Sequence, residues 1–214
     1  MLVVAGLDPA TPIVDARSVP SQAGWPGQAR PWMWPGKKLL FMTDPRLGPL
    51  MLDRLRRGDS PQQAIDAAIA GTPGPKWRQL AVIDRQGRTA SYSGASVRGE
   101  RGEAHGHDCV AIANIVRSPS IPAAMIKAFE REPAAPLPLR LIEALEAGHA
   151  AGGEPRPLVS ACLIVVHRET FPYVDLRVDS DADPIGTLRR FWRDYEPAAD
   201  LYVARALTPD ASLE

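Results

Sequence analysis

Apolar residues recur at regular spacing from residue 43 onward, whereas residues 1–42 show no sustained period. Six prolines interrupt the first segment, and only its apolar run LVVA has the composition of a strand. The pattern divides the chain into an atypical Pro- and Trp-rich segment at 1–42, a regular domain at 43–196 and a C-terminal tail at 197–214. We expect little regular structure in the first segment and a peripheral position for the tail.

Five stretches of the regular domain have the apolar spacing of a helix. Asp44 followed by Pro45 is expected to cap the first helix, which ends at Gly58. The sequence SPQQ at 60–63 is a capping box for the second helix. The remaining three helices are expected after Ser118-Pro119, at Leu137 and after Asp183-Pro184.

Strand-like residues occupy the stretches between these helices. RQLAVIDRQGRTASYSG predicts a hairpin around a turn that contains glycine, and CVAIANIV predicts a third strand after a polar loop. The continuous apolar run ACLIVV predicts a central strand covered on both faces, while VDLRVD alternates between apolar and charged residues. Because strands and helices occur in groups, the chain is expected to be an α+β protein with antiparallel sheets and helices outside them.

Composition narrows the classes of function. Lys and Arg equal Asp and Glu at 25 each, so the charge favours neither nucleic acid nor an anionic membrane as a partner. No apolar run reaches the ~20 residues that span a bilayer, and the N-terminus shows no secretory pattern, so we expect a cytoplasmic protein. Cys109 and Cys162 both lie in apolar runs and are expected to pack in the core.

Six segments, taken in order, resemble the DUF1028 family: TDPRLGPLMLDRLRRGDSPQQAI, RQLAVIDRQGRTASYSG, DCVAIANIV, LRLIEALEAGHAAGGE, SACLIVV and VDLRVDSDADPIGTLRRFWRDYEP. The resemblance begins at Thr43 and extends to about residue 207. It implies a fold like that of the N-terminal nucleophile (Ntn) hydrolases, a four-layer α-β-β-α sandwich of antiparallel sheets. It also implies hydrolysis of amide bonds in small molecules, although a fold alone does not establish a function.

Residues 1–42 do not match that family, so the N-terminal strands of the sandwich are expected to be missing or irregular. An Ntn hydrolase attacks with the side chain of its first residue. If Met1 were removed, that residue would be Leu2, whose side chain has neither oxygen nor sulfur. The stretch WPGQARPWMWPGKK at 25–38 holds three of the five tryptophans. It is either a recognition surface or, as we favour, part of a segment that derives from a displaced reading frame, a misplaced start or a truncated gene. Amide hydrolysis and a non-catalytic binding or interaction module therefore both stay open.

Several polar residues could serve a site. The candidates for catalysis are Thr43, Asp44, His107 and Asn114, and those for substrate binding are Arg46 and Ser160. A histidine can act as a general base, and an asparagine amide can donate to an oxyanion. Arginine can bind a carboxylate with two hydrogen bonds. Each also has a structural alternative, such as a helix cap at residue 43 or 44.

Residues 103–108 hold the densest group of metal-ligand types, with Glu103, His105, His107 and Asp108. Two histidines in one glycine-containing loop supply only part of a site, so we expect an exposed polar loop and no metal. Metal-dependent hydrolysis through His105 and His107 stays a third hypothesis. The sequence has no P-loop, Rossmann fingerprint, HExxH or GxSxG, and we expect no cofactor. A small-molecule substrate and a homodimer are the partners that these features leave open.

Overall fold

The structure is a computed structural model that describes residues 2–5, 14–17, 44, 46–169 and 171–210. The described part holds eight strands: β1 (Leu2–Ala5), β2 (Val14–Arg17), β3 (Gln79–Ile83), β4 (Thr89–Ser93), β5 (Glu100–Gly106), β6 (Cys109–Val116), β7 (Ala161–Val166) and β8 (Pro172–Val178). Its helices are α1 (Leu47–Arg56), α2 (Pro61–Gly71), α3 (Ile121–Glu130), α4 (Leu137–Ala150), α5 (Pro184–Tyr195) and α6 (Ala199–Leu207), with short 3-10 turns at Pro75–Trp77 and Glu196–Ala198.

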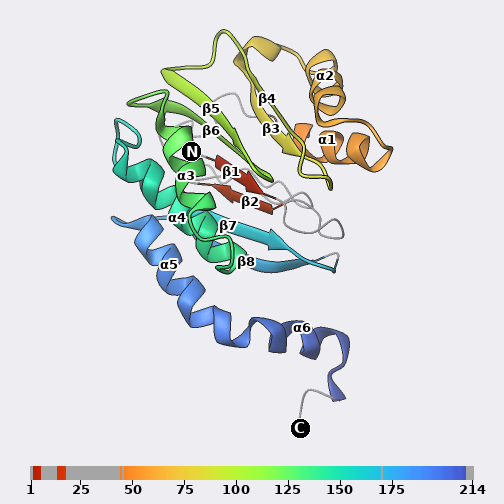
Figure 1. The fold of residues 1–214 in the computed structure, drawn as a ribbon, viewed down its shortest axis with the longest axis vertical. Helices are drawn as coiled ribbons and strands as arrows, with labels where there is room; N and C mark the ends of the chain where they lie inside the picture. The colour runs from red at the N-terminus through yellow and green to blue at the C-terminus, as the bar shows by residue number, and fades with distance from the viewer. Residues whose placement is uncertain (1, 6–13, 18–43, 45, 170, 211–214) are drawn as a thin grey trace, which may run out of the picture.

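Six strands form one antiparallel sheet in the order β5-β6-β1-β2-β7-β8, and β3 pairs with β4 in a separate hairpin (Figure 1). The predicted α+β class with antiparallel sheets is therefore confirmed. The strand expected from LVVA is β1, which lies in the middle of the large sheet. The expectation of little further structure in residues 1–42 is wrong for Val14–Arg17, because this segment pairs with both β1 and β7.

The predicted polar loop before CVAIANIV is wrong, because residues 100–106 form the edge strand β5. Its sequence ERGEAHG has no apolar alternation, since one edge of an edge strand faces water and its charges discourage pairing with other chains. The strand forms because β6 offers it a partner along its whole length. His105 accordingly lies in a strand rather than in a loop.

The continuous apolar run of β7 also led to a wrong prediction. The strand is the last but one in the sheet, and its burial alternates along the chain. Leu163 and Val165 are buried, whereas Ile164 and Val166 are half-buried. The alternation predicted for VDLRVD is confirmed in β8, where Val174 and Val178 are buried and the charged residues between them are exposed.

Helices cover each sheet from outside. Helices α3, α4 and α5 pack on the large sheet around Phe129, Leu141, Leu145, Leu163 and Leu188. Helices α1 and α2 pack on the outer face of the hairpin, around Met51, Ile65, Val82 and Ala90. A third cluster of Ile83, Val110 and Ile112 joins the hairpin to the large sheet. The complete four-layer sandwich stays a prediction, because the second sheet of the described residues has two strands.

Local caps explain where several helices begin. The Ser60 hydroxyl accepts a hydrogen bond from the Gln63 backbone N–H, and the Gln63 side chain accepts from the Ser60 N–H, which confirms the predicted capping box. Asp183 caps α5 by accepting from the Gly186 N–H. The cap predicted at Asp44 is wrong: α1 begins at Leu47, and its N-cap residue Arg46 makes no side-chain cap.

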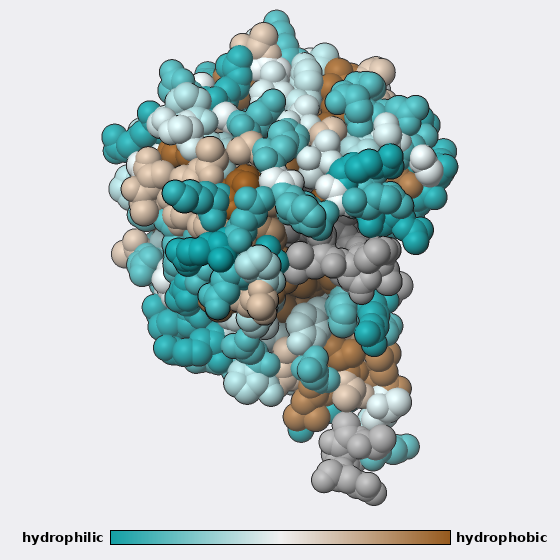
Figure 2. Space-filling model, in the orientation of Figure 1, coloured by the Kyte–Doolittle hydropathy of each residue, from teal (hydrophilic) through white to brown (hydrophobic). Residues whose placement is uncertain are grey.

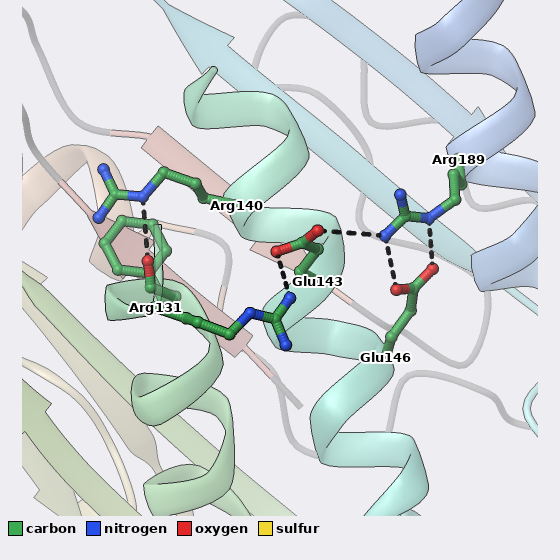
Figure 3. Close-up of polar contacts among 6 residues, drawn as sticks. Arg131, Arg140, Glu143, Glu146 and Arg189 are labelled. Carbon is green, nitrogen blue, oxygen red and sulfur yellow. Dashed lines mark hydrogen bonds and ion pairs between the residues drawn. The ribbon is translucent and has the colours of Figure 1, made fainter. Parts of the chain in front are cut away.

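Ion pairs connect the three helices on the large sheet (Figure 3). Nε and Nη2 of Arg189 on α5 donate to the Glu146 carboxylate of α4 at 2.6 and 2.7 Å. Nη2 of Arg131 donates to Glu143 at 2.9 Å, and Nε of the buried Arg140 donates to the Phe129 carbonyl at 3.0 Å. These contacts align α3, α4 and α5, and the two ion pairs among them, which are partly exposed, add at most about 1 kcal/mol each.

The predicted peripheral tail begins with a helix, α6, which follows α5 and projects beyond the sheet (Figure 1). The Tyr173 hydroxyl of β8 donates to Asp200 of α6 at 3.0 Å, and the Tyr195 hydroxyl donates to the Tyr173 carbonyl at 3.0 Å. Cys109 is buried and Cys162 is half-buried. None of the helices described is long and apolar enough for a bilayer crossing.

Candidate functional site

Two of the predicted site residues pair with each other. The Arg46 side chain donates to the Asp44 carboxylate through Nε at 2.9 Å and Nη2 at 2.8 Å. These hydrogen bonds lower the pKa of Asp44 to about 2. The Arg46 side chain is 78% exposed, whereas that of Asp44 is 8% exposed, so the pair joins a covered carboxylate to a surface arginine before α1. Thr43 lies outside the described residues.

The other three predicted residues lie on separate elements. His107 lies in the turn after β5, where its side chain is 90% exposed and its Nδ1 is 3.0 Å from Asp108. Its backbone N–H donates to the Glu130 carboxylate at 2.7 Å. Ser160 is buried directly before β7. Asn114 is half-buried on β6 and donates to the Gln79 side-chain carbonyl of β3 at 2.7 Å.

The structure instead brings polar residues together between the hairpin and the edge of the large sheet. Alternation along β4 sends Ala90 and Tyr92 toward α1 and α2. Thr89, Ser91 and Ser93 therefore lie on the opposite face, toward β5. We call the residues that meet there the polar seam: Gln79, Thr89, Ser91, Ser93, Glu103, His105 and Asn114.

His105 of β5 lies between two hydroxyl groups of β4. Its Nδ1 is 2.7 Å from the Thr89 Oγ1, and its Nε2 is 2.9 Å from the Ser91 Oγ. A neutral imidazole has one N–H donor and one acceptor nitrogen. In the tautomer with Nδ1–H, this group donates to the Thr89 Oγ1, and Nε2 accepts a hydrogen bond from the Ser91 hydroxyl. The two hydroxyls thus hold the ring in an orientation that suits proton transfer from Ser91.

An amide network continues the seam beside this histidine. Nε2 of Gln79 donates to the Ser93 hydroxyl and to the Ala113 carbonyl, both at 3.1 Å. The Ser93 hydroxyl lies 3.5 Å from Glu103, at the limit of a hydrogen bond. Gln79 therefore ties the hairpin to β6.

The arrangement has the geometry of an activated nucleophile. A serine within hydrogen-bond reach of a histidine, whose second nitrogen is held by a third group, is the general pattern for nucleophilic catalysis. Ser91 is half-buried and His105 is exposed. The third group here is the Thr89 hydroxyl instead of a carboxylate.

Sequence reasoning did not find Ser91, Thr89 or Gln79. In TASYS, every second residue is a threonine or a serine, which places a row of hydroxyl groups on one face of the strand. Only the packing of β4 against β5 shows that these hydroxyl groups meet His105. The sequence groups His105 with the metal-ligand types at residues 103–108. Within the described part of the chain, no three His, Cys, Asp or Glu side chains lie close enough to hold a metal ion.

Cys109 is the other nucleophile type near this end of the sheet. Burial, assisted by the nearby Glu130 carboxylate, raises the pKa of its thiol to about 12. A thiol with such a pKa stays protonated and unreactive at neutral pH. Its packing against α3 in the main core confirms the predicted structural role.

Comparison with known proteins gives a matching family and a similar solved structure. The sequence model of DUF1028, a family of unknown function, matches residues 40–188. The crystal structure of protein SPO2555 from Silicibacter pomeroyi, described with the same family, is 27% identical and has a TM-score of 0.73. That match covers 91% of this chain and 85% of the other. A comparison with curated proteins gives no significant match.

Proposed function

The chain belongs to DUF1028, a family of unknown function, and we propose that it hydrolyses an amide or ester bond in small molecules through Ser91 and His105. The observation that carries this proposal is the 2.9 Å distance between the Ser91 Oγ and the His105 Nε2, with Thr89 at the other ring nitrogen. The resemblance to Ntn hydrolases supports the same reaction class. The proposed reaction differs from that of an Ntn hydrolase in the attacking group, which here is the Ser91 side chain within β4 instead of the side chain of the first residue.

Each atom of the pair has a defined task in this reaction. The Ser91 Oγ attacks the substrate carbonyl carbon while its proton moves to the His105 Nε2. The imidazolium then returns that proton to the leaving amine or alcohol, which leaves an acyl group on Ser91. Water attacks the acyl group, again giving a proton to Nε2, and Ser91 recovers the proton when the acid departs. Thr89 keeps the ring oriented throughout.

A second candidate, a non-catalytic binding module, is favoured by the composition of the seam. A hydroxyl at Nδ1 stabilises an imidazolium less than a carboxylate does. The nearest amides already have protein partners, since Asn114 donates to Gln79 and Gln79 donates to Ala113. In this alternative, the chain binds a small molecule or a protein partner on the same fold, with no chemical step at Ser91.

Turnover of a chromogenic ester and anilide panel distinguishes the two functions. We expect Ser91→Ala and His105→Gln each to lower kcat/KM by at least about a hundredfold. Ser118→Ala is the matched control, because the Ser118 hydroxyl also hydrogen-bonds to a side chain, the Ser120 hydroxyl at 2.7 Å, but has no histidine partner. Activity that survives Ser91→Ala would exclude Ser91 as the attacking group, and no turnover by the native chain would support the binding module instead.

A further inference from the structure

Arg140, in the first turn of α4, is buried although its side chain is charged. Hydrophilic residues cover most of the face shown in Figure 2, where water solvates them, but Arg140 is only 4% exposed. A charged side chain is almost never buried unless it is paired. The described residues hold one other buried charged residue, Asp84, and its carboxylate forms an ion pair with Arg88 at 2.6 Å. Arg140 forms no ion pair with a carboxylate of the described residues.

The guanidinium group of Arg140 is held in place by Phe129 of α3. Nε donates to the Phe129 carbonyl at 3.0 Å, and Cζ lies 3.9 Å from the centre of the Phe129 ring. Figure 3 shows the group extending from α4 on the opposite side from Arg189. Nη1 is buried and has no hydrogen-bond partner among the described residues. The contacts therefore fix the orientation of the guanidinium group and leave a buried donor unsatisfied.

Two ionisable groups near Arg140 do not supply the missing negative charge. Burial lowers the pKa of Arg140, while Cys109 and Glu130 act in the opposite direction. The Cys109 thiol has a pKa of about 12, so it is uncharged at neutral pH. The Glu130 carboxylate accepts a hydrogen bond from the His107 backbone N–H at 2.7 Å and does not pair with Arg140. Because arginine stays protonated in proteins, the buried charge has no direct counter-charge from these neighbours.

We propose that Arg140 binds a small inorganic anion, of which chloride is the simplest, through Nη1. A buried donor without a protein partner points to a bound water or ion. Water would satisfy the hydrogen bond but not the charge, whereas an anion does both. Nε, which would form half of a side-on bidentate pair with a carboxylate or phosphate, already donates to the Phe129 carbonyl. A monatomic anion therefore fits the remaining donor best.

This inference is independent of the proposed hydrolysis. Val110 and Ile112 of β6 face the hairpin, while the intervening face of the strand, which includes Cys109, packs with Phe129 in the main core. Arg140 and the polar seam thus lie on opposite faces of the large sheet. The bound anion would join the end of α3 to the start of α4, so it should stabilise the folded chain.

Urea unfolding of the full chain in sodium chloride tests the site, with sodium gluconate used to keep the ionic strength constant. One charge-assisted hydrogen bond corresponds to a dissociation constant of about 10 mM. Chloride that binds only the folded chain should then lower the unfolding equilibrium constant about thirtyfold at about 300 mM. The NMR linewidth of chloride is the second measurement on the native chain, because exchange with a bound site broadens it.

Uncharged variants assign the effect to Arg140. Arg140→Met should change its unfolding constant less than about twofold between gluconate and chloride. Arg140→Gln should behave in the same way, and its amide can still donate to the Phe129 carbonyl if methionine prevents folding. Arg131→Met is the matched control and should keep the native chloride dependence, because Arg131 is 64% exposed and pairs with Glu143.

Two results would overturn the proposal. One is a native chain whose unfolding constant does not depend on chloride and which does not broaden the chloride line. The other is a folded uncharged variant at residue 140 that keeps the native chloride dependence.

Discussion

Gly102 in β5 lies where the strand passes the turn that precedes α3. A Cβ at this position would lie 2.9 Å from the Pro119 carbonyl carbon and 3.1 Å from its Cα, and closer still to the carbonyl oxygen. These are backbone atoms, so they cannot rotate away as a side chain would. Forcing a methyl group into a packed site costs up to about 3 kcal/mol, and replacing a strand glycine returns less than about 1 kcal/mol of backbone entropy. Gly102→Ala should therefore lower the free energy of unfolding by about 2 kcal/mol.

Gly71→Ala is the matched control for this substitution. Gly71 is the exposed last residue of α2, and a Cβ there would have no neighbour within 4 Å. Alanine should stabilise the protein at this position by a few tenths of a kcal/mol, up to about 1. Urea unfolding followed by circular dichroism measures both changes. Equal effects at Gly71 and Gly102, or no loss at Gly102, would refute the close approach of β5 to the Pro119 turn.

Three further predictions concern a cap, a carboxylate and a thiol. Ser60→Ala should lower the free energy of unfolding by about 1 kcal/mol in urea, because it removes one half of the capping box of α2. Because Arg46 lowers the pKa of Asp44 from 3.8 to about 2, the ionised carboxylate adds stability that is complete above pH 3.8 and is lost as the pH falls through about 2. When the pH falls from 3.8 to about 2, Asp44→Asn should therefore lose less stability than the native chain in acid unfolding. An acid-unfolding profile equal to that of the native chain would argue against the ion pair. Burial raises the pKa of Cys109 to about 12, so iodoacetamide should label it only in denaturant, as mass spectrometry of the peptides would show.

The elements that the sequence predicted well are those with local signals. Ser60 and Asp183 cap their helices through residues three positions away, so four or five residues of sequence contain the whole interaction. The hairpin of β3 and β4 is equally local, since Asp84 accepts hydrogen bonds from the backbone of Gln86 and Arg88 within its turn. Asp44 failed as a cap because its carboxylate bonds to Arg46 instead.

The elements that the sequence pattern did not predict depend on partners far along the chain. Strand β2 has only four residues and becomes a strand by pairing with β1 and β7, the second of which lies almost 150 residues away. Strand β5 has no apolar alternation, so a pattern of hydrophobicity cannot reveal it. The run ACLIVV predicts a central strand, because a continuous apolar run is typical of a strand covered on both faces. In the structure this strand, β7, is the last but one of the large sheet.

The candidate site was missed for the same reason. His105 was noticed as part of a histidine-rich motif, but its neighbours in sequence are not its partners in space. Thr89 and Ser91 precede it by 16 and 14 residues, on another sheet. Only the packing of the hairpin against β5 and β6 brings them together, and that packing follows from the apolar contact of Ile83 with Val110 and Ile112.

Covalent labelling of Ser91 tests the reactivity of the polar seam most directly. A fluorophosphonate reacts with a serine whose hydroxyl proton a neighbouring base removes, and peptide mass spectrometry identifies the modified residue. The geometry at His105 predicts one adduct per chain on Ser91, labelling at least about a hundredfold slower in His105→Gln, and native labelling in Ser118→Ala. A chain that stays unmodified, or that is labelled equally fast without His105, would contradict an activated serine at this site.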